Sequence, residues 1–245
     1  MQEALRAGRP INKVLIAQDT GRHTVVGAIL HLARERKIVV EHVDRRVIER
    51  LSSTGHSQGV LALAAAKPYA TMEQMLEAAQ AQGQPALLVL LDGIEDPQNL
   101  GAIIRTAEGA GAHGVVIPER RAVGLTAAVG RASAGAIEYV PVAQVSNLSN
   151  SIRELGKRQV WTVGIDPAGD REYTQVDFRQ PTAIVIGAEG SGLSHLIKER
   201  CDMLASIPMR GKVASLNASV AAALVLYEAL RQRGAVAAPL MAPHP

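Results

Sequence analysis

Side chains that bind ligands or carry out chemistry gather in three stretches of this 245-residue chain. The first, residues 92–105, contains Asn99 and Arg105. Because Arg105 stands close to Ile103 and Ile104, its charge is expected to need an anionic partner, either a phosphate of a ligand or a carboxylate of the chain. The stretch therefore predicts a substrate contact or an internal salt bridge.

The second stretch, residues 187–194, follows an apolar segment and is rich in glycine. Glycines let a backbone approach a ligand closely, so Gly187, Gly190 and Gly192 indicate a binding loop. The carboxylate of Glu189 disfavours a phosphate and suits hydrogen bonds with hydroxyl or amino groups. The Lys and Ser/Thr of a P-loop are absent. The alternative is a glycine-rich turn that binds nothing.

The third stretch begins at Ile207 and leads into a long helix rich in Ala, Leu and Val. Three residues of types that cap helix N-termini, Ser215, Asn217 and Ser219, stand near its start, and Gly234 marks its end. A helix N-terminus offers unpaired N–H groups and partial positive charge, which suit a carboxylate or another electron-rich ligand. The alternative is a well-capped helix of the core.

An alternation of strands and helices must position these stretches. Strands are expected at 86–91, 114–118, 139–142, 160–165, 183–186 and 204–207, and helices at 71–82, 97–110, 122–134, 146–157 and 193–200. Asp96 is expected to cap the helix that begins at Pro97. This alternation predicts an α/β fold with a parallel sheet covered on both faces. Ligands of such sheets sit beyond the carboxyl ends of the strands, where all three stretches begin. Periodicity alone would predict an ordinary doubly wound sheet.

A smaller α/β unit precedes this part. Strands are expected at 11–18, 39–43 and 60–66, helices at 24–37 and 44–51, a polar loop at 52–59 and a linker at 67–70. Residues 1–68 contain 11 Lys/Arg and 6 Asp/Glu, whereas the remainder contains 15 and 17. A basic unit beside a near-neutral body indicates a polyanionic partner, and ordinary surface charge is the alternative.

Other patterns exclude functions. The run Gly109–Gly114 matches G-x-G-x-x-G, but a helix is expected before it and a strand after it, so Gly109 or Gly111 is expected to end a helix instead of binding a dinucleotide. A single cysteine, Cys201, permits no internal disulfide or cysteine metal cluster and suits the reducing cytoplasm. The histidines are too scattered for a metal site. No stretch resembles a signal peptide or a membrane span.

The three stretches together resemble a known family. Residues 96–105, 186–193 and 207–219 look like motifs one, two and three of the SpoU/TrmH group of the SPOUT superfamily, which are RNA ribose 2′-O-methyltransferases. The resemblance covers roughly residues 85–234. The N-terminal unit is similar to the substrate-binding domain of the RlmB-like branch, which has a ribosomal L30-like fold. The implied division is a small RNA-binding domain at 1–67 and a methyltransferase domain at 68–245.

The resemblance implies a deep trefoil knot, S-adenosylmethionine bound in a bent shape, and an obligate homodimer with active sites at the interface. No metal, DNA or membrane is implied, and the location is the cytoplasm. The residues that it places around the adenosyl group are Gly187, Gly190, Gly192, Ile207, Met209 and Leu216. The residues that match the family's functional polar positions are Asn99, Arg105, Glu189, Ser215 and Asn217.

Family precedent gives Arg105 the removal of the ribose hydroxyl proton. Since an arginine stays protonated in nearly all proteins, the alternative is that Arg105 holds the adjacent phosphate and lowers the pKa of the hydroxyl. Asn99 would orient the ribose or Arg105, Glu189 and Asn217 would hold the loops and substrate in register, and Ser215 would assist.

The two-domain layout favours a guanosine of large-subunit (23S) ribosomal RNA as the substrate. Transfer RNA enzymes of the family carry different terminal extensions, and some antibiotic-resistance enzymes with the same layout methylate an adenosine of ribosomal RNA. The rival functions are a non-catalytic RNA-binding protein, which an intact Asn99, Arg105, Glu189 and Asn217 disfavour, and a nucleotide-dependent oxidoreductase.

Overall fold

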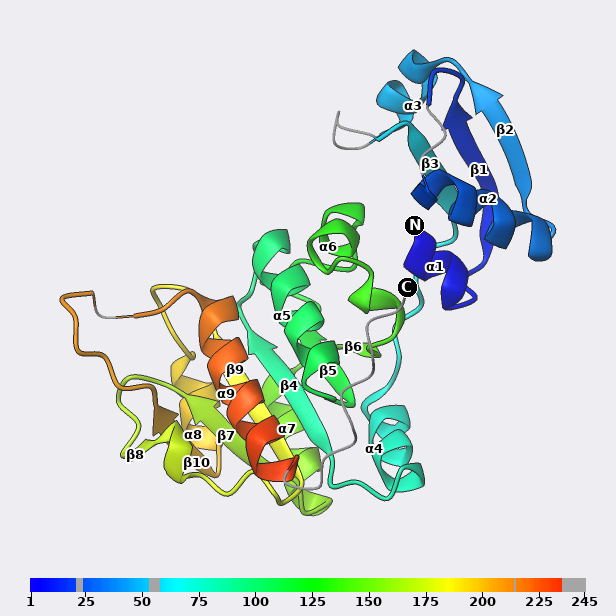
Figure 1. Ribbon diagram of the computed structural model, residues 1–245. Helices are drawn as coiled ribbons and strands as arrows, with labels where there is room; N and C mark the ends of the chain where they lie inside the picture. The colour runs from blue at the N-terminus through cyan, green and yellow to red at the C-terminus, as the bar shows by residue number, and fades with distance from the viewer. Residues whose placement is uncertain (21–23, 53–57, 214, 235–245) are drawn as a thin grey trace.

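The computed structural model describes residues 1–20, 24–52, 58–213 and 215–234. Two β-sheets organise it: a three-stranded sheet with the order β2-β1-β3 and a seven-stranded sheet with the order β6-β5-β4-β9-β7-β10-β8. Figure 1 shows the two sheets as separate bodies, each with its own helices. No helix in this part of the chain is long and apolar enough to cross a membrane.

The small sheet forms the N-terminal body. Its strands are β1 (Ile11–Ala17), β2 (Val39–Val43) and β3 (Val60–Ala64), and its helices are α1 (Gln2–Arg6), α2 (Thr24–Glu35) and α3 (Arg45–Leu51). Strand β1 pairs in parallel with β2 and antiparallel with β3. These strands and the helices α2 and α3 confirm the predicted elements, whereas α1 was not predicted. The predicted loop at 52–59 falls partly outside the described residues.

Every pairing in the large sheet is parallel, as predicted. Its strands are β4 (Leu87–Asp92), β5 (Gly114–Pro118), β6 (Val142–Val145), β7 (Trp161–Ile165), β8 (Arg171–Glu172), β9 (Thr182–Gly187) and β10 (Met203–Ser206). Its helices are α4 (Met72–Ala81), α5 (Pro97–Gly109), α6 (Ala127–Ala132), α7 (Leu148–Lys157), α8 (His195–Arg200) and α9 (Ala218–Arg233), with 3-10 turns at η1 (Ala136–Glu138) and η2 (Tyr173–Gln175).

Both faces of the large sheet are covered, as predicted. On one face the core includes Ile103 of α5 and Val225 of α9, and on the other it includes Met75, Ile152 and Ile197 of α4, α7 and α8. The side chains of β4 alternate between the two cores, which is the period of two expected for a strand buried on both faces.

Two predicted elements differ from the structure. The strand predicted at 139–142 is β6, at 142–145, because the chain first forms the 3-10 turn η1 behind Gly135, whose φ is 95°. The helix predicted at 122–134 is only α6, at 127–132, since its N-terminus is fixed where the Thr126 side chain accepts a hydrogen bond from the Val129 amide. Strand β8 was not predicted.

The strand order corrects the doubly wound sheet that periodicity alone predicts. Strand β9 is inserted between β4 and β7, both of which precede it in the chain, and β10 pairs with the far side of β7. This order places the ends of β4, β9 and β7 side by side. The trefoil knot itself stays a prediction.

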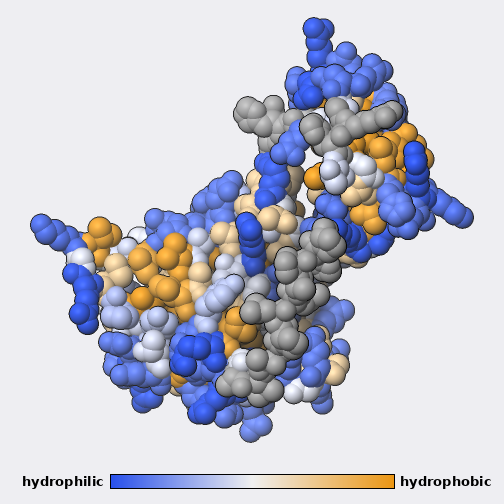
Figure 2. Space-filling model, viewed as in Figure 1, coloured by the Kyte–Doolittle hydropathy of each residue, from blue (hydrophilic) through white to orange (hydrophobic). Residues whose placement is uncertain are grey.

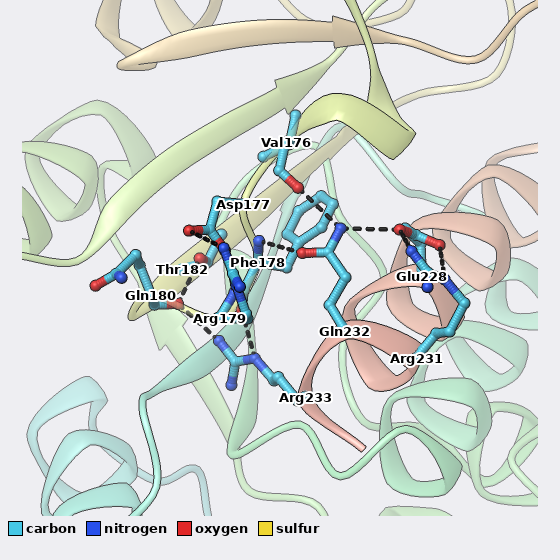
Figure 3. Close-up of polar contacts among 10 residues, drawn as sticks. All are labelled: Val176, Asp177, Phe178, Arg179, Gln180, Thr182, Glu228, Arg231, Gln232 and Arg233. Carbon is cyan, nitrogen blue, oxygen red and sulfur yellow. Dashed lines mark hydrogen bonds and ion pairs between the residues drawn. The ribbon is translucent and has the colours of Figure 1, made fainter. Parts of the chain in front are cut away.

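The last turn of α9 is fixed to the amino end of the large sheet (Figure 3). Arg233 donates hydrogen bonds to the carbonyls of Phe178 (2.6 Å), Gln180 (2.8 Å), Pro85 (2.6 Å) and Ala86 (3.0 Å). Burial lowers the pKa of Arg233 to about 10. Arg233 therefore anchors the end of α9 to the segments that lead into β4 and β9.

The two bodies contact each other between α1 and η1. Arg9 forms an ion pair with Glu138 at 2.7 Å, and Glu138 is almost wholly buried. The Tyr139 hydroxyl donates to the Glu3 carboxylate at 2.6 Å. Lys67, in the predicted linker, donates to the carbonyl of Val140 at 3.1 Å.

Candidate functional site

The three stretches singled out in the sequence meet at the carboxyl end of the large sheet. They follow β4, β9 and β10, and β4 and β9 are neighbours. The side chain of Asn217 joins all three. Its Nδ2 donates to Asn99 Oδ1 and to Glu189 Oε2, each at 2.9 Å. Its Oδ1 accepts from the backbone N–H of Ser219 at 2.9 Å and so caps α9. The predicted cap is confirmed, and the cap residue also links the two other stretches.

The first stretch is fixed by its own capping and by a contact with the second. Asp96 accepts a hydrogen bond from the Gln98 amide at 3.0 Å, with Pro97 at the first helical position, as predicted. This cap places Asn99 in the first turn of α5. Asp92, at the end of β4, accepts from the Ser194 amide at 2.7 Å and ties β4 to the start of α8.

The glycines of the second stretch serve the geometry of the loop. A Cβ on Gly187 would lie 2.2 Å from the backbone of Gly192, so the loop can fold back on β9 only because Gly187 has no side chain. Gly190 and Gly192 have φ values of 85° and 65°, which favour glycine. Residues 187–192 thus form a tight glycine turn, and the same turn is the loop that lines the cavity described next.

A cavity of about 310 Å³ opens between the second and third stretches. Its lining includes every residue predicted to surround the adenosyl group, Gly187, Gly190, Gly192, Ile207, Met209 and Leu216, together with Glu189 and Ser215. Its volume falls within the roughly 300–1,000 Å³ of small-molecule sites. Apolar walls, a glycine loop and a few polar groups suit a nucleoside-like ligand such as S-adenosylmethionine.

Sequence reasoning missed one wall of this cavity. Residues 165–168, the last residue of β7 and the three that follow it, line it together with Lys198 of α8 and with Ala218 and Ala221 of α9. The rule that ligands lie beyond the carboxyl ends of strands could have included the end of β7. Asp166 is only 3% exposed, so this wall brings a buried carboxylate to the cavity.

The structure bears on one of the two alternatives for Arg105, the internal salt bridge. The side chain is exposed, it does not line the cavity, and among the described residues it forms neither a hydrogen bond nor a salt bridge. Ile103 and Ile104 point into the core, whereas Arg105 comes out on the solvent side of α5. An internal salt bridge is thus not found among the described residues, and the contact with a substrate phosphate stays a prediction.

The remaining sequence predictions concern Gly111 and Cys201. Gly111 follows the end of α5 with φ of 70°, and the Ala112 amide donates to the Ala107 carbonyl, so the G-x-G-x-x-G run is a helix end as predicted. Cys201 is partly buried, and burial raises the pKa of its thiol to about 12. In the described ranges no three His, Cys, Asp or Glu side chains are grouped so as to hold a metal.

Two family models match the chain. The model described as SpoU rRNA Methylase family matches residues 86–227. The model described as RNA 2′-O ribose methyltransferase substrate binding matches residues 1–70. Among curated relatives, the TrmH family tRNA/rRNA methyltransferase YacO of Bacillus subtilis is 44% identical over 96% of this chain and 93% of its own length.

Solved structures also match this chain. The SpoU methyltransferase AviRb from Streptomyces viridochromogenes, in complex with AdoMet, has a TM-score of 0.79 and 28% identity, covering 94% of this chain and 86% of its own. An AdoMet-bound rRNA methyltransferase from Sinorhizobium meliloti has a TM-score of 0.76 and 27% identity, covering 94% and 83%. A TrmH/SpoU tRNA modifying enzyme from A. aeolicus has a TM-score of 0.56 and 27% identity, covering 65% and 84%.

Proposed function

The chain belongs to the SpoU rRNA methylase family of RNA ribose 2′-O-methyltransferases, and from this premise we propose that it methylates a guanosine of large-subunit (23S) ribosomal RNA. S-adenosylmethionine is the methyl donor. Nearly the whole chain, with its N-terminal body, aligns with a solved rRNA methyltransferase, whereas the tRNA modifying enzyme aligns with a smaller share. The basic N-terminal body would bind the RNA, and its boundary with the methyltransferase domain lies at 67/68 in this proposal.

The observation that carries the proposal is the position of Asn217. One amide side chain bonds Asn99 of the first motif and Glu189 of the second, at the mouth of the cavity. In this proposal Glu189 and Asn217 hold the loops in register, Asn99 orients the ribose, and Ser215 assists at the rim. The donor lies in the cavity against Gly187, Gly190, Gly192, Ile207, Met209 and Leu216.

The methyl group of S-adenosylmethionine is carried on a sulfonium, which is a good leaving group. The residues of the chain then need to align the ribose hydroxyl with it and to promote loss of the hydroxyl proton. Arg105 serves the second task, either by taking the proton or by holding the adjacent phosphate and lowering the pKa of the hydroxyl. Its full exposure, with no partner among the described residues, supports the phosphate contact.

Arg105 acts in the cavity of a second subunit. The residue does not line the cavity of its own chain, yet it borders a surface suited to association. A Cβ on Gly109, one turn after Arg105, would lie 3.3 Å from the Tyr227 hydroxyl. Val220, Leu224 and Tyr227 form a stripe on α9 and are 46%, 39% and 54% exposed.

Figure 2 shows hydrophobic side chains gathered on the face that carries α9. A helix that is apolar on all sides is normally buried on all sides. The buried side of α9 packs on its own sheet, and the stripe formed by Val220, Leu224 and Tyr227 would be covered by a second copy in a homodimer.

A mixing experiment tests this dimer. Arg105→Ala removes the arginine, and Leu216→Trp fills the cavity. When the two inactive variants are co-expressed, a heterodimer has one intact site only if Arg105 reaches the partner's cavity. With random pairing, half of the dimers are heterodimers, so activity should recover to roughly a quarter of the wild-type level. If Arg105 serves its own chain, every site stays damaged and no activity returns.

The order of β4, β7, β9 and β10 is the support for the proposed trefoil knot. A reducing cytoplasm is the proposed compartment, supported by the single, partly buried Cys201.

The substrate is tested by incubating the protein with methyl-labelled S-adenosylmethionine and unmodified transcripts of 23S ribosomal RNA and transfer RNA. Alkaline hydrolysis then locates the label, because a 2′-O-methyl group blocks cleavage. One protected guanosine in ribosomal RNA is the expected result. A protected adenosine would indicate the specificity of the resistance enzymes, and label in transfer RNA would overturn the substrate. A protein that retains RNA but transfers no label, to transcripts or to ribosomal particles, would instead be a non-catalytic RNA-binding protein.

A further inference from the structure

The wall of the cavity formed by the end of β7 carries a buried carboxylate with no role so far. Asp166 follows the last residue of β7 and is 3% exposed. An isolated carboxylate in such a place is costly unless a partner or a ligand compensates its charge and its hydrogen-bonding capacity. The partners of Asp166 therefore indicate which kind of ligand group can bind beside it.

One oxygen of Asp166 is engaged by its own loop. Oδ1 accepts a hydrogen bond from the Ala168 amide at 3.0 Å, which fixes the carboxylate in a local turn. The other oxygen, Oδ2, lies 2.8 Å from Nζ of Lys198 on α8. That ion pair supplies the compensating charge, but Oδ2 has no hydrogen bond of good geometry among the described residues. The carboxylate thus keeps acceptor capacity.

The free acceptor capacity faces the glycine loop that surrounds the adenosyl group in the proposal above. Asp166, Lys198 and Gly192 all line the cavity, and a Cβ on Gly192 would lie 3.4 Å from Oδ2. The second cavity-lining carboxylate, Glu189, is already held by Asn217. Of the two carboxylates that line this cavity, Asp166 is therefore the one that is fixed in place and keeps a buried oxygen without a hydrogen bond among the described residues.

The neighbouring ammonium selects the kind of donor. S-adenosylmethionine presents cationic groups, its ammonium and sulfonium, and neutral donors, its ribose hydroxyls and adenine amino group. A cation beside Oδ2 would be repelled by Lys198 Nζ, which lies 2.8 Å from the same oxygen. A carboxylate at the carboxyl end of a strand is also the usual partner of a nucleotide ribose.

We propose that Asp166, held by Lys198, accepts hydrogen bonds from the ribose hydroxyls of S-adenosylmethionine and so makes the cavity selective for a ribonucleoside. The inference rests on the proposed assignment of this cavity to the methyl donor. Asp166 is a binding residue that takes no part in the transfer step, and Lys198 is a positioning residue that acts through it.

Calorimetric titration with two unreactive probes tests the proposal. The probes are S-adenosylhomocysteine and its 2′,3′-dideoxy analogue, which lacks only the ribose hydroxyls. The wild-type protein should bind the first roughly 10- to 100-fold more tightly, the factor expected for a hydrogen bond to a charged group. Asp166→Asn should weaken the binding of S-adenosylhomocysteine more than that of the dideoxy analogue. The ratio of the two dissociation constants should then be close to one.

The matched control is Glu199→Gln, which makes the same change from carboxylate to amide at an exposed position of α8 outside the cavity. It should keep the ratio, while thermal unfolding reports any loss of stability in either variant. A purely structural Asp166 would lower the affinity for both probes equally, and that result overturns the proposal. Equal binding of both probes by the wild-type protein also overturns it, without any variant. If the wild-type protein binds neither probe, the proposal that this cavity binds the methyl donor is itself wrong.

Discussion

At the amino end of the seven-stranded sheet, Arg233 donates hydrogen bonds to four backbone carbonyls, whereas at the carboxyl end Asp166 keeps an oxygen without a hydrogen bond from the described residues, beside a cavity. Arg105, on the exposed side of α5, likewise forms no hydrogen bond or ion pair among the described residues. Each end also has the opposite kind of group: buried His113 at the amino end has an Nε2 that no described residue bonds, and Asn217 at the carboxyl end bonds Asn99 and Glu189. The comparison is therefore between Arg233, whose bonds are made within the chain, and Arg105 and Asp166, which keep hydrogen-bonding capacity that the described residues do not use.

The difference separates stability from function. A polar group whose bonds are all made inside the chain costs folding free energy when it is removed, because its partners are left unsatisfied. A polar group whose partner is a ligand costs activity when it is removed and leaves folding almost unchanged. Variants of the two kinds should therefore fail in different measurements.

The largest effect is expected from Arg105→Ala. Methyl transfer to RNA should fall by about 10²–10⁴-fold, the range for loss of a group that acts on a transferred proton or on charge in the transition state. Binding of S-adenosylhomocysteine and the midpoint of urea unfolding should stay unchanged, because Arg105 neither lines the cavity nor contacts the described residues. Arg158→Ala, at the exposed end of α7, is the control and should leave activity intact. Loss of stability in Arg105→Ala would break the comparison.

The next effect is expected from Arg233→Met, at the opposite end. The variant keeps an apolar stem but leaves the carbonyls of Phe178 and Gln180, among others, without their donor (Figure 3). The free energy of unfolding should fall by about 3 kcal/mol, measured by urea denaturation, while the folded enzyme keeps its activity at low temperature. Arg231→Met removes the exposed partner of Glu228, and Gln232 still donates to Glu228 at 2.8 Å, so stability should fall less than in Arg233→Met.

A smaller loss of activity is expected from Asn217→Asp. Aspartate caps a helix as well as asparagine does, so the start of α9 should remain intact. The variant removes the Nδ2 donor and places a carboxylate beside Glu189, which now accepts from Asn217 at 2.9 Å. Methyl transfer should fall roughly 10- to 100-fold, as for one lost hydrogen bond to a charged group, with circular dichroism unchanged. Full activity would show that the link between the motifs is dispensable.

The smallest effect concerns pH at the amino end. Burial, and next the charge of Arg233, lower the pKa of His113, so the folded protein keeps this imidazole neutral below the ordinary His pKa of about 6.5. The unfolded chain takes up that proton first, and stability should therefore fall as the pH drops from about 6.5 toward the lowered pKa. Urea denaturation between pH 7 and 5 measures the slope. His113→Asn, which removes the titration, should flatten it, and so in part should Arg233→Met. An unchanged slope in both variants would contradict the assignment.

The amino-acid sequence determined the local features of this protein. The parallel strands, the caps at Asp96 and Asn217, and the helix end at Gly111 depend on residues close together in the chain, and the structure has them where they were predicted. The three motifs also identified the family and most of the cavity lining, because the spacing of glycines and polar residues within each loop is itself a local property.

The tertiary structure alone decided what joins or separates those features. The bond from Asn217 to Asn99 spans 118 positions, and the bond from Arg233 to Pro85 spans 148. Helical or strand periodicity cannot predict such pairs, because the residues come together only when β9 lies between β4 and β7. The same order brings Asp166 to the cavity, and the rotation of α5 places Arg105 in solvent. The physical reason is that burial and partnership depend on packing between distant segments, whereas capping and periodicity depend on neighbours in the chain.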